Sequence, residues 1–286
     1  MIPRVVIPVA GRATRLRPWS AAAPKAMLPL IGPDGRLRPV VHWILAEAVA
    51  AGIERAALVV SAGQRAVLDA YLHAARDAGD VDLPAEVVYV DQPRPAGLGD
   101  AVLRAADFAA GEPVLVMLGD HVHRAAPGRG ACAAQLAEAM ARHGGEAMVG
   151  MQVIGPDALG RCGAAAGEPL GESDPTGRTY RPTALIEKPD PATARRELIT
   201  AGLGPDRFLA HAGIYAFSPA IFDCLQALHA GGAGSGGEVQ LTDAQKLLYD
   251  RGGALLYRID GTVLDTGTPE AYGAAFAAFA ADPPAP

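Results

Sequence analysis

The chain is poor in cysteine and lacks any long hydrophobic run. Cys132, Cys162 and Cys224 are widely spaced and form no CxxC pair, which argues against a disulfide framework or a zinc site and favours a reducing cytoplasm. No stretch approaches the roughly 18 apolar residues of a membrane span. Arg4 followed at once by a strand pattern is not typical of a signal peptide. These absences predict a cytoplasmic protein with no membrane partner.

Basic charge is also scarce, and lysine is scarcer still. The formal net charge of −6 argues against nucleic acid as a main partner, because phosphate backbones bind basic surfaces. Among the 25 basic residues only Lys25, Lys188 and Lys246 are lysines. Where arginine is the usual basic residue, a lysine is a candidate for phosphate binding, since its ammonium acts as a compact point charge. Chance placement is the alternative.

Strand and helix patterns alternate through the N-terminal half. Apolar strand patterns lie at residues 4–9, 56–61, 86–90, 113–118 and 147–153, and helical patterns lie at 39–52, 64–78, 98–110 and 129–143. Continuous apolar strands separated by helices are typical of a mainly parallel sheet covered on both faces. Ligands of such sheets bind beyond the carboxyl ends of the strands.

The pattern loosens after residue 155. Residues 155–181 are rich in glycine, proline and charge, and we expect loops or short hairpins there. Strands are predicted at 183–187, 208–217 and 254–259, helices at 241–251 and 268–281, a flexible loop at 230–237 and a frayed tail at 282–286. No repeat or clear boundary divides the chain, so we predict a single domain over residues 1–286.

A turn of small residues follows the first strand, in the segment Val9-Ala-Gly-Arg-Ala-Thr-Arg-Leu-Arg-Pro18. Backbone N–H groups of such a turn can hold anionic oxygens. Arg15 and Lys25 add positive charge beside it. The segment is neither a Walker A loop nor a GxGxxG motif, and a tight turn without a ligand is the alternative for Gly11.

Two carboxylates are candidates for binding a metal ion. Asp120 follows the buried strand 113–118, and Mg²⁺ is usually held by one or two carboxylates together with substrate phosphates. Capping of the following turn is the alternative. Asp265 is a second candidate ligand. The Thr268-Pro269 pair after it predicts a helix start with Thr268 as N-cap.

Glu187 and Lys188 come at the end of another predicted strand. Neighbouring strand residues point to opposite faces, so both side chains can face one ligand only if the strand ends there. Pro189 favours such an ending. An exposed ion pair is the alternative.

Together these segments resemble the sugar-1-phosphate nucleotidyltransferase family, and most closely the bacterial UTP–glucose-1-phosphate uridylyltransferases. The matching segments are residues 7–18 with 24–29, 97–102 with 118–120, 187–189 and 237–243. Residues 265–272 resemble the ending of that family and of the thymidylyltransferases.

The resemblance implies a GT-A-like (Rossmann-like) α/β fold, with a mixed, mainly parallel sheet flanked by helices and a small β-rich substrate-binding subregion. Residues 1–155 would bind the nucleotide and residues 156–286 the sugar phosphate. A sugar-1-phosphate, with glucose-1-phosphate as first choice, would attack the α-phosphorus of a nucleoside triphosphate, with UTP as first choice, in the presence of Mg²⁺. A homo-oligomer is implied as well. The alternatives are a thymidylyltransferase, a pyrophosphorylase for another sugar or cyclitol phosphate, a non-catalytic nucleotide-sugar sensor and a glycosyltransferase.

The family's functional positions can be carried over residue by residue. The resemblance implies triphosphate binding by the backbone of Ala10 and Gly11 and the side chains of Arg15 and Lys25, base contacts by Gln92 and Gly97, Mg²⁺ binding by Asp120 and Asp265, and sugar-phosphate binding by Gly163, Glu187, Lys188 and Gly213. Arg15, Lys25 and Asp120 would be the catalytic set. The attacking phosphate is already a nucleophile, so positioning and charge stabilisation are expected to carry the catalysis.

Some positions depart from the family pattern. The third loop glycine is replaced by Ala13, which fits only if that position avoids a strongly positive φ. Ala26 stands in place of an acidic or amide residue, and Cys162 in place of a tyrosine. We interpret His121 and His123 as an incidental pair in a loop. These departures bear on the sugar and the base rather than on the reaction.

Overall fold

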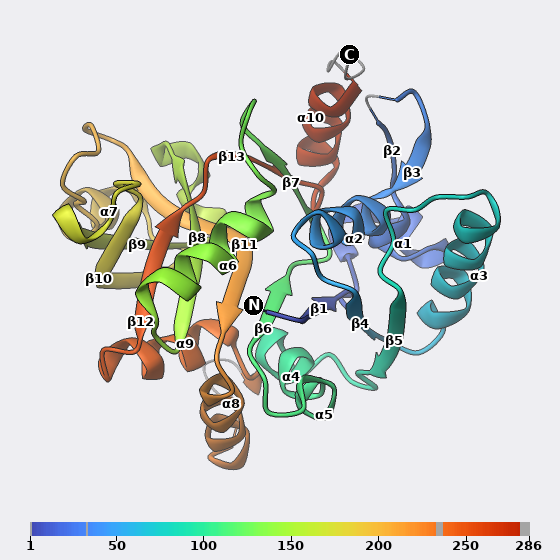
Figure 1. The fold of residues 1–286 in the computed structure, drawn as a ribbon, viewed down its shortest axis with the longest axis horizontal. Coiled ribbons are helices and arrows are strands. Elements are labelled where there is room, and N and C mark those ends of the chain that lie inside the picture. Colours follow the sequence, from blue (N-terminus) through green and yellow to red (C-terminus); the bar gives the residue numbers. More distant parts are fainter. Residues whose placement is uncertain (1, 33, 233–236, 281–286) are drawn as a thin grey trace.

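Nine strands form one mixed sheet with helices on both faces (Figure 1) in the computed structural model, which describes residues 2–32, 34–232 and 237–280. The order is β5-β4-β1-β6-β11-β8-β12-β10-β9. The strands are β1 (Arg4–Pro8), β4 (Arg55–Val60), β5 (Glu86–Asp91), β6 (Val114–Met117), β8 (Ala147–Ile154), β9 (Gly163–Pro169), β10 (Thr179–Glu187), β11 (Phe208–Phe217) and β12 (Ala254–Arg258). The predicted mixed α/β fold is confirmed.

Strand direction changes in the middle of the sheet. β5, β4, β1 and β6 are parallel to one another, and β8 is parallel to β12. β11 is antiparallel to β6, β8 and β9, and β10 is antiparallel to β12 and β9. The carboxyl ends of β1 and β6 therefore lie side by side, and β11 brings the C-terminal half of the chain next to them.

Side chains of the central strands alternate between two cores. Val5 and Ile7 of β1 belong to one core and Val6 to the other, and Leu115 and Val116 of β6 divide in the same way. The first core is covered by α2 (Val40–Ala50), α3 (Gln64–Asp77) and α6 (Cys132–His143), and the second by α4 (Leu98–Leu103), α5 (Ala106–Ala109), α8 (Ala220–Ala230) and α9 (Leu241–Asp250). Burial on both faces explains why these strands are continuous apolar runs in the sequence.

Smaller elements complete the fold. Two-stranded sheets pair β2 (Pro29–Ile31) with β3 (Leu37–Pro39) and β7 (His121–Ala125) with β13 (Gly261–Asp265). The short helices are α1 (Trp19–Ala22), α7 (Pro191–Glu197), η1 (Thr14–Leu16), η2 (Lys25–Met27), η3 (Pro156–Arg161) and η4 (Gly171–Ser173), and α10 (Pro269–Ala280) is the last helix described. Within the described ranges, none of the helices is both long and apolar enough to cross a membrane.

Several local predictions were wrong. The helix expected at 98–110 breaks after Leu103, where the amide of Ala105 donates to the carbonyl of Val102 in a three-residue turn. Residues 155–181 contain all of β9, which forms a long hairpin with β10, and β10 begins at Thr179 rather than 183. The elements α1, β2, β3, β7, α7 and α8 were not predicted, and of β13 only the strand end at Asp265 was expected.

The predicted start of the last helix agrees with the structure. Thr268 caps α10 as expected, because its hydroxyl accepts a hydrogen bond from the amide of Ala271 at 3.2 Å. Residues 233–236 of the predicted loop at 230–237 and the whole predicted tail at 282–286 lie outside the described residues.

Candidate functional site

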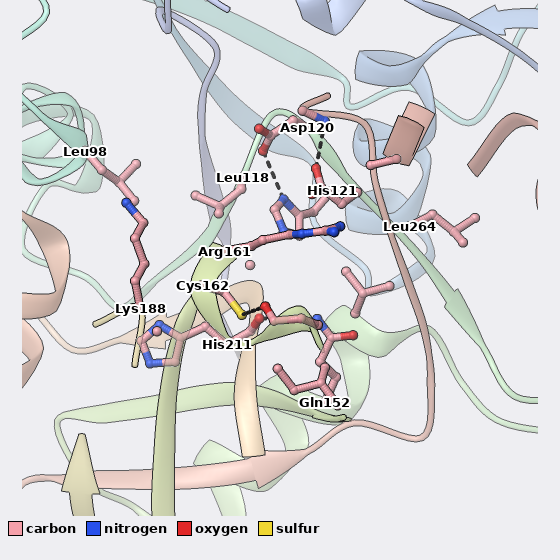
Figure 2. Close-up of a pocket in the computed structure, with 18 of the residues that line it drawn as sticks. Leu98, Leu118, Asp120, His121, Gln152, Arg161, Cys162, Lys188, His211 and Leu264 are labelled. Atoms are coloured by element: carbon pink, nitrogen blue, oxygen red, sulfur yellow. Dashed lines mark hydrogen bonds and ion pairs between the residues drawn. The ribbon is translucent and has the colours of Figure 1, made fainter. Parts of the chain in front are cut away.

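A cavity of about 840 Å³ opens beside the carboxyl ends of β1 and β6, within the size range of small-molecule sites. Its wall contains most of the predicted site residues: Arg15, Lys25, Asp120, Gly163, Glu187, Lys188, Gly213 and Asp265. Ala10, Gly11, Gln92 and Gly97 do not form part of that wall. The fold thus brings together residues from both halves of the chain (Figure 2).

The loop after β1 runs beside Lys25. A Cβ atom added at Gly11 would lie 3.9 Å from the Cε and Nζ atoms of Lys25, and Ala10 is buried under the loop. Ala13 has φ +46° and ψ +44°, in the left-handed region, so the expectation that an alanine here avoids positive φ was wrong. This conformation costs an alanine roughly 1–2 kcal/mol. Ala13 is the N-cap of the short helix η1, and η1 places Arg15 on the cavity wall.

Asp120 is placed on the cavity wall by a glycine. A Cβ atom at Gly119 would lie 2.6 Å from the carbonyl oxygen of Pro8, so only glycine lets the end of β6 pass this close to the end of β1. The two carboxylate oxygens of Asp120 accept hydrogen bonds from Lys25 Nζ at 2.5 Å and from His121 Nδ1 at 2.9 Å. Segments far apart in sequence, one carrying Lys25 and one carrying Asp120, therefore meet at this carboxylate.

Asp265 converges on Asp120 through backbone pairing. The β7–β13 ladder sets Asp265 opposite His121, and the amide of Thr266 donates to the carbonyl oxygen of Asp120 at 2.8 Å. A Cβ atom at Gly267 would lie 3.0 Å from Asp265 Oδ1 and 3.3 Å from Asp120 Oδ2. One ligand atom each from Asp120, His121 and Asp265 lie within 4.8 Å of one another, a separation that a single metal ion could bridge.

The interpretation of the two histidines as an incidental loop pair was wrong for His121. Both lie on strand β7 rather than in a loop, and residues two apart on a strand point to the same face. His121 lines the cavity beside Asp120, whereas buried His123 donates from Nε2 to the carbonyl oxygen of Ala212 at 2.8 Å. Its adjacency to Asp120 was the sequence signal for His121.

The cluster keeps Asp120 ionised. Burial alone would raise the pKa of the Asp120 carboxyl, but Lys25 and His121 outweigh it and hold that pKa well below its usual range. Burial would lower the pKa of His121, yet the hydrogen bond and charge of Asp120, helped by Asp265, raise it. A fixed negative charge beside the Lys25 side chain is thus available at neutral pH.

The other end of the cavity is built by the β9–β10 hairpin. Its register sets Glu187 opposite Gly163. β10 ends at Glu187, and Lys188 has φ +47° with its amide donating to the carbonyl oxygen of Cys162 at 3.2 Å. The expected strand ending is confirmed, and it lets both half-exposed side chains line one cavity, with Lys188 Nζ 3.7 Å from Glu187 Oε1.

Two glycines permit close approach around this end. A Cβ atom at Gly163 would lie 3.0 Å from Glu187 Oε2 and 3.1 Å from the ring of His211. Gly213 has φ +73° at an irregularity of β11, and a Cβ atom there would lie 2.8 Å from the His121 ring. Gly213 requires glycine for its backbone conformation and for its contact with His121, whereas an alanine at Gly163 would press on the Glu187 and His211 side chains.

Gln92 and Gly97 lie behind the wall. The amide nitrogen of Gln92 donates to the carbonyl oxygen of Gly97 at 3.0 Å and to Asp100 Oδ2 at 2.8 Å. Gly97 has φ +103°, and a Cβ atom on it would collide with the carbonyl oxygen of Val239. The segments 97–102 and 237–243 therefore pack against each other. The Gln92 nitrogen holds the backbone at Gly97 by its hydrogen bond to that carbonyl oxygen.

Several cavity residues were missed from the sequence. They are Arg161, Gln152, His211, Tyr215 and Gln245, together with His121 and Cys162, which had been noted without a role. In Figure 2 the Arg161 side chain extends between the group formed by Asp120 and His121 and the group formed by Cys162 and His211. Its position two residues before Gly163 was the available signal. Nothing in the sequence indicated His211 or Gln245.

Comparison with known proteins gives a consistent assignment. Residues 4–282 match the family model described as nucleotidyl transferase. A UTP–glucose-1-phosphate uridylyltransferase of Bacillus subtilis (strain 168) is 30% identical over 280 residues, which cover 92% of this chain and 86% of the relative. UTP–glucose-1-phosphate uridylyltransferase 2 of Staphylococcus saprophyticus is 31% identical over 281 residues, covering 93% and 88%. A crystal structure of UDP-glucose pyrophosphorylase complexed with UDP-glucose superposes with a TM-score of 0.80 at 25% identity, covering 98% of this chain and 99% of the other.

Proposed function

The chain belongs to the nucleotidyl transferase family, and we propose that it joins UTP to glucose-1-phosphate, giving UDP-glucose and pyrophosphate. The names of the relatives support this pair of substrates. The observation that carries the proposal is one cavity with two chemically different ends. Lys25 with Asp120 and Asp265 lies at one end, and Glu187 with Lys188 lies at the other.

The triphosphate belongs at the end formed by the loop after β1. Arg15 and Lys25 supply positive charge there, and the backbone of Ala10 and Gly11 runs beside Lys25. The base would lie toward Gln92 and Gly97. Because the Gln92 nitrogen is already bonded to Gly97 and Asp100, we propose that the base meets the Gln92 oxygen and the Gly97 backbone.

A divalent ion fits the pair of carboxylates. Mg²⁺ prefers oxygen ligands, and we propose that Asp120 and Asp265 hold it, with His121 beside them. Gly267 keeps the space between the two carboxylates open. A bound Mg²⁺ would neutralise part of the charge on the triphosphate. Lys25 already contacts one oxygen of Asp120, so it would lie next to that charge as well.

The sugar phosphate belongs at the opposite end. We propose that Glu187 accepts hydrogen bonds from sugar hydroxyls, that Lys188 binds the sugar phosphate, and that Gly163 and Gly213 leave room for the sugar. The end of β10 supports this, because it directs two adjacent side chains into one cavity. The two halves of the chain, residues 1–155 and 156–286, would then work as one domain, with the nine-stranded sheet running through both.

Charge is the main obstacle to the reaction. Two like unit charges about 5 Å apart repel by roughly 3 kcal/mol at an effective dielectric of about 20. The phosphate of the sugar must approach the α-phosphorus against several such terms. Arg15, Lys25, Lys188 and Arg161 surround the cavity, so this chain offsets the repulsion locally although its net charge is −6. Positioning of the two phosphates and stabilisation of the leaving pyrophosphate then account for catalysis.

Pyrophosphate release tests the proposal. Purified protein would be mixed with Mg²⁺ and each pairing of UTP, dTTP, ATP, CTP or GTP with glucose-1-phosphate, galactose-1-phosphate or a cyclitol phosphate. UTP with glucose-1-phosphate is expected to give the highest kcat/KM. A clear preference for dTTP would assign a thymidylyltransferase instead, and binding of UDP-glucose without turnover of any pair would assign a non-catalytic sensor.

A further inference from the structure

Two polar side chains on the cavity wall carry buried atoms that have no hydrogen-bond partner among the described residues. Gln245 of α9 is 2% exposed, and neither its amide nitrogen nor its amide oxygen has a hydrogen-bond partner among the described residues. His211 of β11 is 6% exposed, and its Nε2 is likewise unpartnered within the described part of the chain. Both side chains line the cavity of the candidate site.

Such groups are costly to leave unsatisfied in a core. A buried amide or imidazole nitrogen without a partner loses its hydrogen bonds to water and gains none in return, so native proteins rarely keep one without a reason. Gln135 provides the contrast. It is also buried, at 7% exposed, but its amide nitrogen donates to the carbonyl oxygens of Gly130 and Asp260, and its amide oxygen accepts from the amide of Asp260.

The position of His211 indicates the part of the ligand concerned. Its ring lies beside Gly163, and the Glu187 carboxylate lies beside the same glycine. This is the end of the cavity proposed for the sugar. Burial lowers the pKa of His211 to about 4, so the ring is uncharged near neutrality. Gln245 carries no charge either. Neutral donors and acceptors suit hydroxyl groups, whereas phosphates are served by the cations elsewhere in the cavity.

We propose that His211 and Gln245 bind hydroxyl groups of the acceptor sugar and so select a fully hydroxylated sugar-1-phosphate over its deoxy analogues. The inference rests on the proposed function and deepens it, because it assigns the residues that determine sugar specificity. A site built to hydrogen-bond a hydroxyl discriminates strongly against the analogue that lacks it, since its own buried groups are then left unpaired.

Deoxy analogues provide the direct test. kcat/KM would be measured at saturating UTP for glucose-1-phosphate and its 2-, 3-, 4- and 6-deoxy forms, in the wild type, His211→Leu and Gln245→Leu. Each variant is expected to lose roughly 10- to 100-fold with glucose-1-phosphate and little with the one analogue that lacks its partner hydroxyl. The KM for UTP should stay within about twofold of the wild-type value. An equal loss with every analogue, or no loss at all, would overturn the inference.

Stability without any ligand gives an independent readout. Gln245→Leu removes two unsatisfied atoms at similar volume, so its Tm is expected to rise by about 2 °C. The matched control Gln135→Leu breaks satisfied hydrogen bonds, and its Tm should fall. A lower Tm for Gln245→Leu would count against an unpartnered amide. If the wild type releases no pyrophosphate with any pair of substrates, the proposed function fails, and the Tm comparison still tests whether the Gln245 amide is unpartnered.

Discussion

Substitution of Gly163 by alanine tests the sugar end of the cavity with the smallest perturbation. Gly163 begins strand β9, where the backbone suits alanine, so the fold should be unaffected. The added Cβ atom would lie 3.0 Å from Glu187 Oε2 and 3.1 Å from the His211 ring, closer than ordinary contact. Both neighbours must move by a few tenths of an ångström.

The size of the effect follows from those two displacements. Each side chain forced away from its preferred rotamer costs about 0.5–1.5 kcal/mol, so the two together cost about 1–3 kcal/mol of sugar binding. The KM for glucose-1-phosphate is therefore expected to increase by a factor of about 5 to about 150. The KM for UTP should change by less than about twofold.

Steady-state pyrophosphate release, with one substrate saturating and the other varied, measures both constants. Gly160→Ala is the matched control, because it lies in the same segment and an added Cβ atom has nothing within 4 Å. An unchanged KM for the sugar phosphate in Gly163→Ala, or an equal rise for UTP, would refute the assignment of this end to the sugar.

Three further predictions concern other parts of the molecule. Ala13→Gly should raise the free energy of unfolding by up to about 1 kcal/mol, because it relieves an alanine at φ +46°; a lower Tm would contradict this. Asp265→Asn should raise the Mg²⁺ concentration needed for half-maximal rate by on the order of tenfold, and excess EDTA should abolish turnover; full activity in EDTA would exclude the proposed metal requirement. Burial lowers the pKa of His123 from 6.5 to about 4, so its contribution to stability is fully present above about pH 6.5 and is lost as the pH falls toward 4. The Tm should fall between pH 7 and pH 5, less steeply in His123→Phe, and equal slopes would show that His123 is not responsible.

The sequence predicts those parts of the site that follow directly from strand ends. Asp120 comes straight after a buried strand, and Pro189 indicates where β10 stops, so the placement of Asp120, Glu187 and Lys188 on one cavity needed only local patterns. Asp265 could be named from the sequence as a second candidate metal ligand, but no local pattern places it next to Asp120. The β7–β13 pairing that joins them spans about half the chain and has no local signal.

Other features depend on packing that a linear pattern does not contain. His211 lines the cavity at a point where the pairing of β11 is irregular, between His211 and Tyr215. Gln245 lines it from α9, whose Leu241 packs in the core on one face of the sheet. Gln92 was expected at the base, but its nitrogen is bonded to Gly97 and Asp100 in three dimensions. The left-handed Ala13 shows that an alanine at this position does not exclude a positive φ.

Product analysis of one reaction tests the central claim most directly. Purified protein, UTP, glucose-1-phosphate and Mg²⁺ should yield UDP-glucose and pyrophosphate in equal amounts. The variants Lys25→Ala and Asp120→Asn each break the Lys25–Asp120 ion pair on the cavity wall. Neither variant should produce UDP-glucose or pyrophosphate, and both should keep a cooperative thermal transition. Undiminished product formation by either variant would contradict the account, as would the absence of UDP-glucose with the wild-type protein.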